Sequence, residues 1–71
     1  MYYEVIHIFK SGFTLTTDSH LQAAAFNKTD ICVWQHGKLI EYGGHIEKIS
    51  DVAVTINGEK YLKATCEFKV R

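Results

Sequence analysis

Short apolar runs are separated three times along this chain by a polar residue followed by glycine. The separators are Lys10-Ser11-Gly12, Gln35-His36-Gly37 and Ile56-Asn57-Gly58. Glycine enters the left-handed backbone region without steric cost, and the polar residue before it favours a turn, so each separator is typical of a tight hairpin. The pattern therefore predicts a chain built mainly from antiparallel β-hairpins.

The first two predicted hairpins differ in the length and continuity of their second strands. The first joins residues 2–9 to residues 13–17 through the loop at Gly12. The second joins residues 31–34 to a longer segment, residues 38–50, which Gly43-Gly44 interrupts. Because paired glycines in a strand indicate a bulge or a sharp bend, we expect this segment to serve two sides of a bent sheet or barrel.

Alternation of apolar and polar residues is clearest in the third hairpin, formed by residues 51–56 and 62–71. A two-residue loop at Asn57-Gly58 would set Val52 against Lys63, an apolar residue against a charged one. A loop of three residues instead pairs Val52 with Leu62 and restores one apolar face. We therefore predict the three-residue loop.

One helical segment is expected, near residues 19–27, and it opens with a capping box formed by Ser19 and Gln22. Two turns of helix are too short to persist alone in water. The segment should therefore lie against the sheet, with Leu21 and Phe26 as its contacts.

These elements together predict one small, mainly β (α+β) domain over residues 1–71. We expect a five- to six-stranded antiparallel sheet, strongly bent or closed into a barrel, with one short helix. A helix followed by a strand, a glycine-bent strand, a strand, a tight turn and a strand resembles the element order of Sm-like and related small barrels. That resemblance covers residues 31–71 and includes no signature motif of those RNA-binding families, so their function is not carried over.

Composition restricts the classes of protein to consider. The 71 residues include eight basic and eight acidic side chains, so the net charge is zero and exerts no overall attraction toward nucleic acid or an anionic membrane. No apolar run reaches the roughly 18 residues that cross a bilayer, and the first residues lack the basic start of a signal peptide. We expect a soluble, cytoplasmic protein without membrane contact, of a size that suits a bacterial or phage accessory protein.

Side chains that could act in catalysis or bind a metal are scattered along the sequence. The histidines are His7, His20, His36 and His45. None has ligand spacing to another histidine or to a cysteine. Neither Cys32 nor Cys66 has a nearby base in the sequence that could activate its thiol. Cys66 falls on the apolar face of its strand. Cys32 shares a face with Trp34, so we expect it to be the more accessible thiol. We therefore predict free thiols, no metal, no cofactor and no enzymatic activity.

Aromatic content favours a binding role. One tryptophan, four tyrosines and four phenylalanines are more than so small a core easily encloses. Tyrosine and tryptophan dominate interface hot spots, although several of these rings could equally fill a barrel interior. We predict a protein-binding module that forms a homo-oligomer. The candidate contact residues are Tyr2, Tyr3, Trp34, Tyr42 and Tyr61.

The alternative is a small barrel that binds nucleic acid or a nucleotide. Basic residues on and near the last strand would contact phosphates, with Trp34 or Tyr42 as stacking platforms. Glu67 interrupts this basic stripe, and a solvated strand face explains it equally well. The basic candidates are Lys60, Lys63, Lys69 and Arg71.

Overall fold

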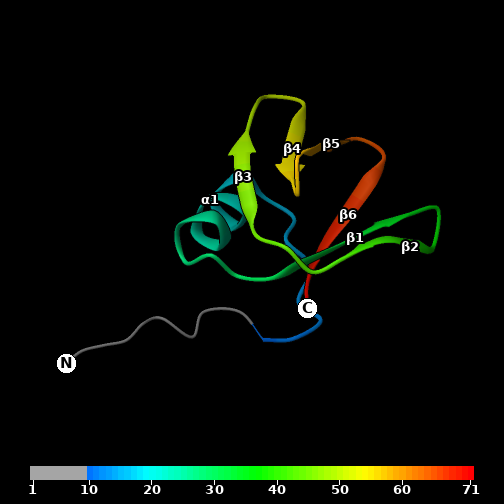
Figure 1. Cartoon of the computed structure of the whole chain (residues 1–71), viewed down its shortest axis with the longest axis horizontal. Helices are drawn as coiled ribbons and strands as arrows, with labels where there is room; N and C mark the ends of the chain where they lie inside the picture. Colours follow the sequence, from blue (N-terminus) through cyan, green and yellow to red (C-terminus); the bar gives the residue numbers. More distant parts are fainter. Residues whose placement is uncertain (1–9) are drawn as a thin grey trace.

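A computed structural model describes residues 10–71 (Figure 1). Over this range the elements are α1 (Asp18–Phe26), β1 (Ile31–Gln35), β2 (Lys38–Tyr42), β3 (Ile46–Ile49), β4 (Ala53–Ile56), β5 (Glu59–Leu62) and β6 (Cys66–Val70). The strands form two three-stranded antiparallel sheets, β2-β1-β6 and β3-β4-β5. The prediction of a mainly β protein with one short helix is confirmed. The closed barrel is not, because the two sheets stay open.

Two of the three predicted turns join strands within the described residues. His36-Gly37 connects β1 to β2, and Asn57-Gly58 connects β4 to β5. Both residues of each pair have positive φ, 53° and 76° in the first and 54° and 80° in the second. These values define two-residue hairpin turns whose twist matches that of the flanking strands. At the third site, Gly12 also has positive φ and a turn returns the Phe13 N–H to the Lys10 carbonyl.

The predicted three-residue loop of the third hairpin is therefore wrong. Asn57 accepts the left-handed conformation itself, so the loop needs two residues and Val54 pairs with Tyr61. The apparent mismatch of Val52 with Lys63 is real, and the Lys63 N–H donates to the Val52 carbonyl at 2.8 Å. It is tolerated because the Lys63 ammonium lies 3.0 Å from the Asp18 carboxylate at the start of α1.

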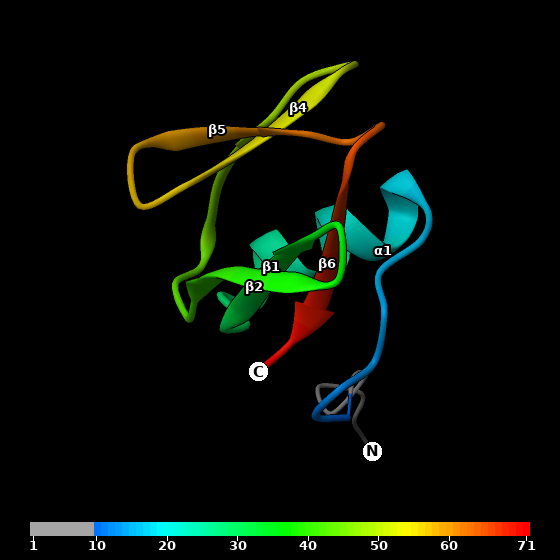
Figure 2. The same ribbon diagram turned by 90° about the vertical axis from the view of Figure 1, so that its right-hand side faces the viewer.

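The last predicted strand is also divided. Turn residues 63–65 separate β5 from β6, and the two strands belong to different sheets. In Figure 2 the chain leaves the β4–β5 hairpin and turns sharply into β6, which pairs with β1. Alternation of apolar and polar residues continues through the turn, so a pattern of period two could not reveal the break.

The bend predicted at Gly43-Gly44 is confirmed. It ends β2 and directs the chain into β3 of the other sheet. The strand before the bend also carries a bulge, since Val33 pairs with Glu41 and Trp34 with Leu39, leaving Ile40 between them.

The start of the described chain runs beside β6 and forms one bridge, between Thr14 and Lys69, in place of the predicted strand over residues 13–17. The Gly12 N–H donates to the Val70 carbonyl and the Leu15 N–H donates to the Phe68 carbonyl. The predicted partner strand, residues 2–9, lies outside the described residues.

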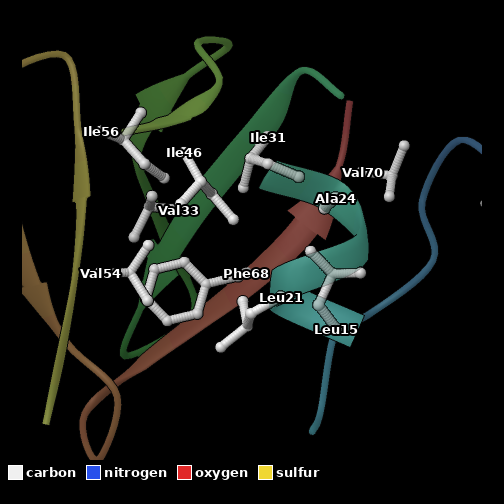
Figure 3. Close-up of a cluster of buried hydrophobic side chains, with 10 residues drawn as sticks. All are labelled: Leu15, Leu21, Ala24, Ile31, Val33, Ile46, Val54, Ile56, Phe68 and Val70. Carbon is white, nitrogen blue, oxygen red and sulfur yellow. The ribbon is translucent and has the colours of Figure 1, made fainter. Parts of the chain in front are cut away.

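Both sheets and the helix surround one apolar core (Figure 3). In the view of Figure 3 the Phe68 ring of β6 lies between Val54 and Leu21, and all three side chains belong to the same core cluster. The buried members of the core are Leu15, Leu21, Ala24, Ile31, Val33, Ile46, Val54, Ile56, Phe68 and Val70.

The N-cap of the helix differs from the prediction: it is Thr17 and not Ser19, and the Thr17 hydroxyl accepts from the His20 N–H at 3.1 Å. The helix ends as predicted, with Asn27 as its C-cap. Leu21 is buried as expected, whereas Phe26 is 87% exposed. Five residues after Leu21, Phe26 lies about 140° around the helix from it and so points away from the core. Within residues 10–71 no helix has the length and apolarity to span a membrane.

Candidate interaction face of the β2–β1–β6 sheet

The face of the β2–β1–β6 sheet that points away from the core gathers four of the side chains singled out from the sequence. In the strand register Cys32 lies opposite both Tyr42 and Lys69, and Trp34 lies opposite Glu67. Residues directly opposite one another share a face, and that face alternates with the buried Ile31, Val33, Phe68 and Val70. We call the surface formed by Trp34, Tyr42, Lys69 and Arg71 the aromatic–cationic face.

Each aromatic ring of this face is matched with a cation. The Lys69 ammonium lies 5.4 Å from the centre of the Trp34 ring, and the Arg71 guanidinium carbon lies 4.8 Å from the centre of the Tyr42 ring. Arg71 also donates to the Asp30 carboxylate at 3.2 Å. These contacts place both cations beside the aromatic rings, where a binding partner could meet ring and charge together.

Apolar side chains border the aromatic–cationic face along β2. Leu39 and Ile40 are 42% and 43% exposed, and Tyr42 is 63% exposed. Trp34 is half-buried, and Cys32 is buried between the rows of longer side chains. A partner that covered this face would remove aromatic and aliphatic surface from water together, which is the main favourable term in protein association.

The remaining predicted site residues lie elsewhere. Lys63 is paired with Asp18, and Lys60 lies on the outward face of the β3–β4–β5 sheet. Tyr61 packs against the core between the two sheets. Tyr2 and Tyr3 lie outside the described residues. The structure therefore brings together two of the aromatic candidates and two of the basic ones, and it separates Tyr61, Lys60 and Lys63 from them.

Tyr61 takes part in a contact between the sheets that the sequence did not indicate. Its hydroxyl donates to Glu41 Oε1 of β2 at 2.8 Å, and the Asn57 amide donates to Glu41 Oε2 at 2.9 Å. The same amide donates to the Gly43 carbonyl at 3.1 Å. Glu41 thus connects the β4–β5 hairpin to β2. Its inward direction follows from the Ile40 bulge, which no local pattern reveals.

Burial raises the pKa of Tyr61 from 10.0 to about 12, and the hydrogen bond to Glu41 and its negative charge add to the shift. Because the unfolded chain ionises this tyrosine first, we expect the free energy of unfolding to fall as the pH rises from 10 to 12. Below pH 10 this contribution to stability is fully present.

Urea unfolding at several pH values tests this expectation. The Tyr61→Phe variant should lose less stability than the wild-type protein across that alkaline range, because it has no phenol to ionise. Tyr42→Phe is the control, since that ring is 63% exposed and should leave the wild-type pH dependence in place. Parallel pH curves for wild type and Tyr61→Phe would contradict the assignment.

Among the thiols and imidazoles, Cys32 lies opposite Tyr42 in the aromatic–cationic face, and the His20 ring lies edge-on to the Phe13 ring with 5.2 Å between the ring centres. Cys32 and Cys66 are free thiols, but Cys32 is the buried one and Cys66 is half-exposed, the reverse of the predicted order. The reason is that long side chains on β2 and β6 cover Cys32, whereas Cys66 begins β6 beside the exposed turn. Over the described part of the chain, no three His, Cys, Asp or Glu side chains are grouped so as to hold a metal ion.

These features define a small α+β protein with two open antiparallel sheets and an aromatic–cationic surface on one of them. Comparison of the chain with family models, curated proteins and solved structures finds no match.

Proposed function

We propose that this protein is a non-enzymatic binding module that acts through protein–protein association, with the aromatic–cationic face as its contact surface. The observation that carries the proposal is the gathering of Trp34, Tyr42 and Arg71 on one face. These are the residue types most enriched among interface hot spots. Exposed Leu39 and Ile40 extend the same surface with aliphatic area.

A second copy of the chain is the partner that this face suits best. It carries charges of both signs, because Glu67 and Lys69 are two residues apart on the same strand. A twofold axis through the face can therefore place the carboxylate of one copy against a cation of the other. A domain of 71 residues also gains stability from association, since it buries a modest share of its own surface.

Replacing Tyr42 with alanine is expected to weaken self-association about tenfold, the effect of losing about 1.4 kcal/mol at an interface tyrosine. Sedimentation equilibrium should give the wild-type protein a mass above the 8.1 kDa of one chain, and the variant should approach that value at the same concentration. Phe26→Ala is the control, because Phe26 is more exposed than Tyr42 but lies on α1. A wild-type mass of 8.1 kDa at every concentration would rule out the second copy as partner.

The second candidate function is the binding of single-stranded nucleic acid, and the same geometry favours it. Two rings with a cation beside each offer base stacking and phosphate contact together. The two functions respond differently to salt, since phosphate contacts weaken steeply as salt rises and apolar burial does not. An oligonucleotide titration at two salt concentrations, repeated with Lys69→Gln, therefore distinguishes them.

A further inference from the structure

Three of the four sheet edges are protected within the described residues. The β2 edge carries the bulge at Ile40, and the β3 edge carries a second bulge at Glu47 and packs against α1. The β6 edge is covered by residues 12–15. These are the usual devices that prevent a strand from pairing with another chain. Among residues 10–71, the edge of β5 has neither a bulge nor a paired segment.

The backbone of β5 directs hydrogen-bonding groups toward this open edge. In an antiparallel pair, hydrogen-bonded and non-hydrogen-bonded positions alternate. The bond from the Lys63 N–H to the Val52 carbonyl shows which positions of β5 are hydrogen-bonded to β4. Tyr61 is one of them, whereas the backbone N–H and C=O groups of Lys60 and Leu62 point away from β4, toward the open edge. The Leu62 carbonyl accepts from the Thr65 N–H, which leaves its N–H and both backbone groups of Lys60 for a further strand.

The side chains of the same two residues line a shallow groove on the outward face of the β3–β4–β5 sheet. The groove has a volume of about 370 Å³ and is also lined by Lys48, Val52 and Thr55. Val52 is 64% exposed and Leu62 is 53% exposed. We call the open edge of β5 together with this hollow the β5 groove. The β5 groove combines backbone N–H and C=O groups that can pair with a strand and an apolar surface beside them.

The charge of the β5 groove is positive. Lys48 and Lys60 lie on either side of Thr55 in one row across the sheet, with their Cα atoms about 10 Å apart. Neither lysine has an ion-pair or hydrogen-bond partner among the described residues. No carboxylate lines the groove, and the neighbouring Glu47 accepts from the Gly58 N–H instead.

We infer that the β5 groove binds an extended acidic–aliphatic peptide segment of a partner protein by strand addition to β5. A carboxylate of the added strand lies beside Lys60, and an aliphatic side chain two residues along rests against Leu62 and Val52. The groove has no aromatic lining on which a nucleic-acid base could stack. Two lysines are also too few to hold the protein on an anionic bilayer, which takes a larger cluster of basic residues.

Fluorescence anisotropy with a labelled Thr-Glu-Thr-Val-Thr peptide tests this inference. We expect Lys60→Glu to weaken binding at least about tenfold, because it sets like charges against each other. Lys38→Glu is the matched control: it is an exposed lysine on β2 of the other sheet and should change binding less than twofold. A peptide with lysine in place of glutamate should bind the wild-type protein weakly and the Lys60→Glu variant better.

Two further measurements separate strand addition from simple charge attraction. Methylation of the peptide amides that face β5 should abolish binding, and the bound peptide should slow hydrogen exchange at the amides of Lys60 and Leu62. Equal binding of the methylated peptide would overturn the inference, as would binding of an oligonucleotide or anionic vesicles, but not the peptide, that depends on Lys60. The result is independent of the proposed self-association, since Tyr42→Ala leaves the β5 groove intact.

Discussion

Replacing Phe68 with alanine is expected to lower the free energy of unfolding by about 3–5 kcal/mol, the usual effect of removing a buried phenylalanine. Phe68 is 3% exposed and belongs to the same core cluster as Val54 of the other sheet and Leu21 of α1. A chain of this length has a total stability on the order of 4–10 kcal/mol. The variant should therefore be largely unfolded at moderate urea concentrations, which circular dichroism will measure as a shift of the unfolding midpoint.

The same substitution at Phe26 provides the control. That side chain is 87% exposed at the end of α1, and its removal should change stability by no more than about 0.5 kcal/mol. A comparable loss in the two variants would mean that the core is not the one described, or that α1 turns its other side to the sheets.

Replacing Gly44 with alanine is expected to cost about 2–4 kcal/mol, from two effects that add. Gly44 has a φ of +123°, which side chains rarely adopt. An added Cβ would also lie 2.6 Å from the Asn57 amide nitrogen. That amide would have to move, and its hydrogen bonds to Glu41 and the Gly43 carbonyl would be lost. Thermal unfolding followed by circular dichroism will show the loss as a lower Tm.

Gly37→Ala separates the two effects. Gly37 also has positive φ, but an added Cβ would meet nothing within 4 Å, so this variant measures backbone strain alone. We expect it to lose about 1 kcal/mol. If Gly44→Ala were no more destabilising than Gly37→Ala, the contact with Asn57 would not contribute to stability.

The elements of the fold follow from local features of the sequence. Gly37 and Gly58 each end a turn, and Gly43-Gly44 bends the chain between sheets, because these conformations are costly for any other residue. Pairing of apolar residues predicts a three-residue loop at Asn57-Gly58, but the turn preference of asparagine followed by glycine decides the two-residue loop. Lys63 lies opposite the apolar Val52, and its charge is paired with Asp18, which is distant in the sequence.

The candidate site was predictable residue by residue but not as a surface. Trp34 and Tyr42 were recognised as aromatic and Lys69 and Arg71 as basic, each from its own segment. Their meeting depends on the pairing of β1 with both β2 and β6, which brings together residues remote in the chain. The β5 groove was hidden for the same reason, since Lys48 and Lys60 become neighbours of Thr55 through the sheet register alone.

Glu41 links the two sheets in addition to the chain segments that join them. Within the described residues the chain crosses between the two sheets at two places, the glycine bend and the turn at residues 63–65. Two such crossings would act as a hinge, and the bonds from Tyr61 and Asn57 to Glu41 add a third tie beside them. We expect these bonds, together with the shared apolar core, to hold the two sheets at a fixed angle. Molecules bound to the outward faces of the two sheets would then keep a constant distance and angle to one another.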